Sequence, residues 1–292
     1  MKERTIRVGK PTPLIGVASE PDAFSADRPA VLVLNSGVMH HVGSCRLSVK
    51  IARAAAARGL LAVRFDYSGI GDSEPRRGAD SFEETATREG IEMMDYLERT
   101  RGVKQFILYG LCSGADMAYL TALADARVVG FAQIDAFCYI TWRYQLNHYV
   151  PKLLDGKRWA GFLRRKLSGG GRDERAPNEI AGIEEEYFEV PTYTRVFPPR
   201  EQVADGLRKL TDRGVAMYVN FTGGEPAYNY ESQYRDSFRD VNFRDLLTLD
   251  YYPLTNHIIT QPQYQTAVVE RIAEWMRELG ERRAAGMMRE VA

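Results

Sequence analysis

From Ala30 onward, short apolar runs alternate with longer amphipathic segments, and this alternation constrains the fold more than any other feature of the sequence. It is typical of parallel strands joined by crossover helices. The predicted strands are Val31–Asn35, Leu60–Asp66, Gln105–Tyr109, Val128–Ile134, Val215–Phe221 and Leu246–Leu249. The predicted helices are Cys45–Arg58, Ser81–Arg101, Ala115–Ala126, Glu201–Arg213 and Pro262–Leu279. The sequence therefore predicts an α/β fold with a mostly parallel central sheet and helices on both faces.

The alternation stops between Phe137 and Arg200, where the sequence is aromatic and basic, then glycine-rich, then acidic. We interpret residues 137–200 as a lid inserted over the carboxyl edge of the sheet. A single core domain would then consist of an N-terminal part, 1–136, and a C-terminal part, 201–292. Residues 1–28 are predicted to form an antiparallel hairpin at the edge of the sheet.

Composition restricts the partners and the compartment. The 292 residues have a formal net charge of zero, so no overall charge attracts nucleic acid or an anionic membrane. No segment reaches the roughly 18 apolar residues that a membrane span requires. The three cysteines, Cys45, Cys112 and Cys138, have neither disulfide-framework nor zinc-site spacing. We expect a cytoplasmic protein without nucleic-acid binding, metal or cofactor.

A nucleophile elbow is the clearest chemical motif. Gly110-Leu111-Cys112-Ser113-Gly114 lies between a predicted buried strand and a predicted helix, in the pattern G-x-nucleophile-x-G with cysteine at the centre. The flanking glycines allow the strained turn, and the following helix N-terminus favours a thiolate at Cys112. The alternative is a buried, inert cysteine in an ordinary turn.

A second turn, Asn35-Ser36-Gly37-Val38, follows the first predicted central strand. In a fold of this kind, the backbone N–H groups of Val38 and Ser113 would converge on a developing oxyanion beside the thiol. The adjacent Met39 and His40 are expected to contact the substrate. A plain turn at a strand end is the alternative interpretation.

The general base is sought among four histidines. His257 lies after the last predicted strand and before the last helix, the place of the histidine in a nucleophile–acid–histidine chain order. Two residues are candidates for the carboxylate that would orient this histidine. They are Glu225, after the strand 215–221, and Asp135, at the end of the strand 128–134. Asp250 is a weaker third candidate.

With these motifs in view, residues 28–280 resemble the α/β-hydrolase superfamily. Phe65-Asp66-Tyr67 and the following Gly69, Gly71 and Ser73 match a structural loop of many members. The run from Val31 to Ser73, with Val42-Gly43-Ser44, is similar to hydrolases associated with bacterial exosortase systems, which also tend to carry a Gly-Leu-Cys elbow. Cysteine at this position is also found in dienelactone hydrolases and polyhydroxyalkanoate synthases. The resemblance implies acyl chemistry.

The predicted function is hydrolysis of an ester or thioester through an acyl-cysteine intermediate. Acyl transfer from a coenzyme A or carrier-protein thioester to an amine or alcohol is the first alternative, and a non-catalytic ligand-binding protein is the second. In the insertion, Trp142 and Tyr144 are expected to contact substrate. The bases and aromatics from Trp142 to Lys166 would suit coenzyme A or an acyl carrier protein, whereas a merely solvated amphipathic helix is the alternative. The sequence also leaves open whether the protein forms a homodimer.

Overall fold

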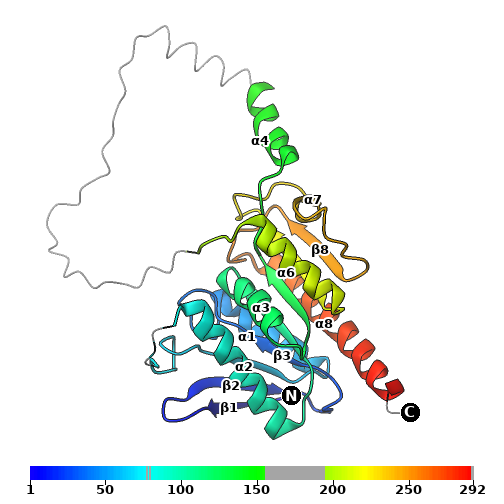
Figure 1. The fold of residues 1–292 in the computed structure, drawn as a ribbon. Coiled ribbons are helices and arrows are strands. Elements are labelled where there is room, and N and C mark those ends of the chain that lie inside the picture. The colour runs from blue at the N-terminus through cyan, green and yellow to red at the C-terminus, as the bar shows by residue number, and fades with distance from the viewer. Residues whose placement is uncertain (77, 79, 155–194, 291–292) are drawn as a thin grey trace, which may run out of the picture.

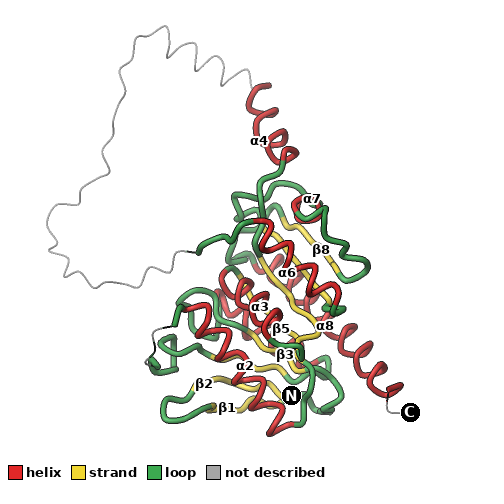
Figure 2. The backbone as a smooth tube through the Cα atoms, viewed as in Figure 1, coloured by secondary structure: helices red, strands yellow, loops and turns green. Residues whose placement is uncertain are grey.

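The computed structural model describes residues 1–76, 78, 80–154 and 195–290. Within these ranges, eight strands form one sheet in the order β1-β2-β4-β3-β5-β6-β7-β8, with helices packed on both of its faces (Figures 1 and 2). The strands are β1 (Lys2–Val8), β2 (Leu14–Glu20), β3 (Ala30–Val33), β4 (Ala62–Phe65), β5 (Phe106–Leu111), β6 (Val128–Ile134), β7 (Ala216–Thr222) and β8 (Leu247–Tyr252).

The sheet is antiparallel only at one edge. Strands β1 and β2 form a hairpin, and β2 pairs antiparallel with β4. All pairs from β4 through β3, β5, β6 and β7 to β8 are parallel. The predicted edge hairpin and the predicted parallel sheet are both confirmed.

Two apolar layers hold the helices to the sheet. Side chains of α1 (Leu47–Ala57) and α8 (Pro262–Glu290) pack on one face, in a cluster that includes Ile51, Tyr109 and Ile272. On the other face, α2 (Phe82–Arg101), α3 (Ser113–Ala124) and α6 (Arg200–Asp212) contribute to a larger cluster. Strands β3, β5, β6 and β7 are buried along their whole length, as expected for parallel strands covered on both faces.

For most helices and strands, the predicted first and last residues lie within a few residues of the observed ones. Strand β6 has the predicted bounds, and α2 begins with the predicted capping box, in which the Glu84 N–H donates to the Ser81 hydroxyl oxygen. Helix α8 is longer than predicted and continues to Glu290. A five-residue helix, α7 (Gln233–Ser237), and a short 3-10 turn, η1 (Ser44–Arg46), were not expected as separate elements.

The predicted insertion lies partly inside the described residues. It follows β6 and contains α4 (Trp142–Leu154), which Figure 1 shows extending beyond the carboxyl edge of the sheet. The basic and acidic stretches expected between Lys157 and Glu186 fall outside the described residues. Among the described helices, none combines the length and apolarity needed to cross a bilayer.

Candidate active site

Cys112 lies at the tip of a sharp turn between β5 and α3. Its backbone is in a left-handed region, with φ 57° and ψ −121°, which is costly for a residue with a side chain. A Cβ on Gly110 would come within 2.0 Å of the Gly114 carbonyl oxygen, and one on Gly114 within 2.5 Å of the Asn35 carbonyl oxygen. The elbow therefore requires both glycines. It leaves Cys112 partly exposed at the N-terminus of α3, whereas Cys138 is buried.

The loop after β8 carries His257. It is packed against the turn after β7 so closely that a Cβ on Gly224 would lie 2.1 Å from the His257 backbone nitrogen. The His257 side chain is about one-third exposed, and its Nδ1 lies 2.6 Å from Asp135 Oδ2. The buried carboxylate thus fixes the orientation of the ring.

Asp135 is positioned by the two strands beside it. It directly follows β6, and its N–H donates to the Asn220 carbonyl oxygen of β7 at 2.8 Å. Its carboxylate accepts from the Thr222 N–H at 2.7 Å and from the Thr222 hydroxyl at 2.8 Å. These two bonds hold a fully buried carboxylate with one oxygen facing His257.

Glu225, the other acid left open by the sequence, has a different environment. The Gly223-Gly224 turn carries it past the end of β7, and its carboxylate accepts from the Ala227 N–H at 3.1 Å. Burial raises the pKa of Glu225, and the nearby negative charge of Asp135 adds to the rise. Asp250, the third candidate, accepts from the Tyr218 hydroxyl and pairs with Arg271. Of the three acids, Asp135 is the one that contacts His257.

The electrostatics of the histidine follow from its two partners. The hydrogen bond with Asp135, and then the one with Cys112, raise the pKa of His257 from 6.5 to about 10, although burial opposes the rise. Because Nδ1 faces Asp135, the other ring nitrogen is the one available to Cys112. At neutral pH, the ring is therefore a cation.

The turn after β3 lies against the elbow through a contact that sequence reasoning missed. The Gly37 N–H donates to the Ser113 hydroxyl oxygen at 2.6 Å. Neither the Val38 N–H nor the Ser113 N–H has a hydrogen-bond acceptor in the part of the chain that the structure describes. Both predicted donors therefore have no intramolecular acceptor there, and the Ser113 hydroxyl connects the turn to the start of α3.

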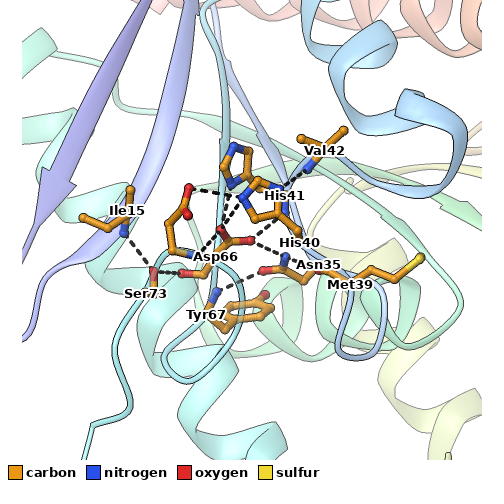
Figure 3. Close-up of polar contacts among 10 residues, drawn as sticks. Ile15, Asn35, Met39, His40, His41, Val42, Asp66, Tyr67 and Ser73 are labelled. Carbon is orange, nitrogen blue, oxygen red and sulfur yellow. Dashed lines mark hydrogen bonds and ion pairs between the residues drawn. The ribbon is translucent and has the colours of Figure 1, made fainter.

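The same turn is held by hydrogen bonds to Asp66, as Figure 3 shows. Asp66 accepts from the Asn35 side chain at 2.9 Å, and its other oxygen lies 2.7 Å from His41 Nδ1. Asn35 also donates to the Met39 carbonyl oxygen at 2.7 Å. Burial alone would raise the pKa of Asp66, but hydrogen bonds from His41, the Asp72 N–H and Asn35 lower it.

This cluster also contains the ligand types of a metal site. The side chains of His40, His41, Asp66 and Asp72 bring four possible ligand atoms within 4.8 Å of one another. Hydrogen bonds already occupy them, however, because the Val42 N–H donates to His40 Nδ1 and Asp66 accepts from several donors. A metal would displace these bonds, so the arrangement fits a clamp on the turn better than a metal centre.

The four predicted substrate contacts lie in two places. Met39 and His40 belong to the turn beside the elbow, and His40 Nε2 lies 3.2 Å from Asp72. In α4, Trp142 is 69% exposed. Tyr144 is buried, and its hydroxyl donates to the Pro226 carbonyl oxygen at 2.8 Å, so it joins α4 to the loop after β7.

A buried ion pair was not foreseen from the sequence. Asp116, in the first turn of α3, accepts two hydrogen bonds of 2.6 Å from Arg195. Burial raises the pKa of Asp116 to about 6, although Arg195 opposes the rise. Their separation of 79 residues leaves no local pattern that could have indicated the pair.

Comparisons with known proteins agree with this architecture. No protein-family model and no curated protein sequence matches the chain. Among solved structures, Est1E from Butyrivibrio proteoclasticus shares 16% identity, covering 94% of this chain and 98% of its own, with a TM-score of 0.57. Mouse alpha/beta hydrolase domain-containing protein 10 shares 12% identity, covering 96% and 100%, with a TM-score of 0.54. Proline iminopeptidase from Mycobacterium smegmatis shares 14%, covering 94% and 99%, with a TM-score of 0.50.

At this level of identity, the likeness shows the fold and nothing finer. The chain has the α/β-hydrolase fold that the sequence predicts: a mostly parallel sheet of eight strands in its described residues, with helices on both faces.

Proposed function

We propose that this chain is an acyl hydrolase that cleaves an ester or thioester through an acyl-cysteine intermediate. The observation that carries the proposal is the 2.6 Å contact between His257 Nδ1 and Asp135 Oδ2, on a ring whose pKa Cys112 also raises. A carboxylate that orients a histidine, together with a nucleophilic side chain that acts on the same histidine, supports nucleophilic catalysis. Solved structures with the same fold include a proline iminopeptidase, which fits hydrolytic chemistry.

The first half of the reaction would form the acyl-enzyme. The Cys112 thiolate attacks the carbonyl carbon, and the carbonyl π electrons move to oxygen. When the tetrahedral intermediate collapses, the bond to the leaving alkoxide or thiolate breaks, and protonated His257 donates a proton to it. Because the pKa of His257 is raised to about 10, the ring carries that proton at neutral pH.

The second half would release the acid. Neutral His257 takes a proton from water, the resulting hydroxide attacks the thioester carbonyl, and the Cys112 thiolate leaves as the carboxylic acid forms. In both halves, the N–H groups of Val38 and Ser113 would stabilise the oxyanion. In other enzymes, removing one hydrogen-bond donor of an oxyanion hole lowers kcat by about 100- to 1,000-fold.

The experiment compares two cysteine variants. In a Cys45→Ser background, which removes the exposed thiol, Cys112→Ala should abolish turnover of p-nitrophenyl and thioester substrates. Cys112→Ser should lose at least about 100-fold in kcat, because a hydroxyl is far less acidic than a thiol and depends on a base to ionise. Cys45→Ser alone is the matched control and should keep wild-type activity.

An amine acceptor separates hydrolysis from acyl transfer. Product analysis with and without a primary amine should give the free acid in both cases. If Cys112→Ala retained the wild-type rate, the thiol would not be the attacking group and the proposal would fail.

A further inference from the structure

Helix α4 exposes one apolar side along its length. Trp142, Leu146 and Val150 follow one another at intervals of four residues, so they lie along the same side of the helix. They are 69%, 48% and 42% exposed, and Ile140, just before the helix, is 56% exposed. We call these four residues the apolar stripe.

The opposite side of α4 makes contacts with the rest of the protein. Tyr144 lies two residues after Trp142, which places it about 200° around the helix axis, on the side away from the stripe. It is buried, its hydroxyl donates to the Pro226 carbonyl oxygen, and its carbonyl oxygen accepts from the Asn229 side chain at 3.1 Å. Figure 1 shows α4 projecting from the body of the molecule. The apolar stripe therefore faces solvent rather than the core.

Two arginines border the apolar stripe. Arg143 and Arg239 line the same cavity as Ile140 and Trp142, a hollow of about 690 Å³. The Arg143 guanidinium carbon lies 4.7 Å from the centre of the Tyr230 ring, a contact that leaves its charge without an anion. Arg239 is exposed and has no hydrogen-bond or ion-pair partner among the described residues.

The acids near these arginines offset them only in part. Of the described residues that line the cavity, two are acidic, Asp236 and Asp240. Asp240 already pairs with Arg200 at 2.8 Å and with Arg208, which leaves Asp236 to offset both arginines. The sequence of α4 contains no acidic residue. The surface beside the stripe is therefore positive.

The positive surface continues on the other side of Arg239. A neighbouring cavity of about 510 Å³ is lined by Arg235, Arg239 and Arg244, and Asp240 is the one acid among the described residues that line it. An anionic surface that contacted the stripe would thus meet several arginines at once.

An apolar helix side bordered by cations has the chemistry of a helix that lies in the surface of an anionic bilayer. Tryptophan favours the boundary between lipid and water, and arginine binds phosphate groups through charged hydrogen bonds. A second copy of this chain fits less well, because a twofold interface at the stripe would bring two positive surfaces together.

We propose that α4 docks this protein on an anionic phospholipid bilayer, where the apolar stripe enters the boundary of the acyl chains and Arg143 and Arg239 bind headgroup phosphates. The carboxyl edge of the sheet, which carries Cys112, would then lie next to the bilayer. The inference does not rest on the proposed function, because binding needs no turnover.

The test is co-sedimentation with vesicles of phosphatidylcholine, or of phosphatidylcholine and phosphatidylglycerol in equal amounts. Wild type should bind the mixed vesicles more strongly, and added salt should weaken that binding. Arg239→Gln should weaken it about 5-fold, because each cation near an anionic surface adds to the attraction. Leu146→Ser should weaken it by at least about 10-fold, because it removes apolar surface that would enter the bilayer.

Matched controls lie far from α4. Arg7→Gln changes another exposed arginine that has no partner among the described residues, in β1 at the opposite edge of the sheet from β8. Phe24→Ser changes an exposed ring, 41% accessible, in the loop that follows β2. Both controls should bind the mixed vesicles as wild type does. Arg239 and Arg7 are exposed and unpartnered, so neither substitution should alter the fold.

Several outcomes would overturn the inference. Wild type might fail to sediment with mixed vesicles, or sediment equally with both kinds, or the α4-side variants might lose no more binding than their controls. A dimer in light scattering that Leu146→Ser converts to a monomer would assign the stripe to a second copy of the chain.

A second readout reports insertion directly. Phospholipids with bromine on their acyl chains quench tryptophans that enter a bilayer. Mixed vesicles that contain them should quench wild type, and Trp142→Phe, which keeps an aromatic ring at this position, should lose most of that quenching. Undiminished quenching in Trp142→Phe would show that the stripe is not the inserting surface.

Discussion

Replacing Asp135 by asparagine is the perturbation that best isolates the carboxylate's role, because it changes the charge and keeps the shape. The amide oxygen can still accept from the Thr222 N–H, as Oδ1 does at 2.7 Å. The amide NH₂ then faces His257 Nδ1, so the ring loses a charged hydrogen bond and is driven to the wrong tautomer. A hydrogen bond to a charged group contributes about 1.5–3 kcal/mol. Losing it in the transition state predicts a fall in kcat/KM of about 10- to 150-fold.

The pH profile gives a second, independent readout. Asp135 is the largest cause of the raised pKa of His257, about 10, so Asp135→Asn should move that pKa toward 6.5. The reaction needs protonated His257 to release an alkyl thiol, so activity is lost as pH rises through this pKa. The alkaline limb should therefore shift to lower pH in the variant.

The assay is the loss of thioester ultraviolet absorbance between pH 5 and about 10.5, a window that brackets both pKa values of His257. Asp250→Asn is the matched control, because it changes another strand-end carboxylate that bonds Tyr218 and Arg271. It should retain the wild-type rate and profile. An Asp135→Asn variant with both unchanged would refute the assigned role of the carboxylate.

Three further predictions concern the elbow and its histidine. Gly114→Ala would place a Cβ 2.5 Å from the Asn35 carbonyl oxygen, and urea unfolding should show a loss of about 1–3 kcal/mol; an unchanged midpoint would contradict this. Ser113→Ala removes the acceptor of the Gly37 N–H, worth about 1 kcal/mol, so kcat should fall about 5-fold with little change in KM. His257 has a raised folded-state pKa, so its contribution to stability is complete below pH 6.5 and lost as pH rises through about 10. Denaturant titrations of wild type and His257→Gln should therefore converge at high pH, and a constant difference would exclude this linkage.

The sheet could be predicted because its signals are local. Apolar runs of strand length are separated by helical patterns, and parallel strands buried on both faces need no partner to be recognised. The elbow was equally readable, since Gly110 and Gly114 flank a single nucleophilic residue at a strand-to-helix junction. The end of α8 was predicted too early because its last turns lack the regular apolar spacing used to follow it.

The choice of acid could not be made from sequence. Both Asp135 and Glu225 follow a predicted strand, and only the three-dimensional packing shows that Asp135 is the one hydrogen-bonded to His257. The Ser113–Gly37 contact spans 76 residues and the Asp116–Arg195 pair 79, so neither leaves a periodic signal. Such contacts depend on how the elements pack.

The most direct test of the account is the mass of the protein after brief incubation with an acyl thioester and acid quenching. We predict a mass increase equal to one acyl group, located by peptide mapping on Cys112 and absent from Cys112→Ala. An adduct confined to Cys45 or Cys138, or turnover without any adduct on Cys112 even when deacylation is slowed by His257→Gln, would contradict the acyl-cysteine mechanism.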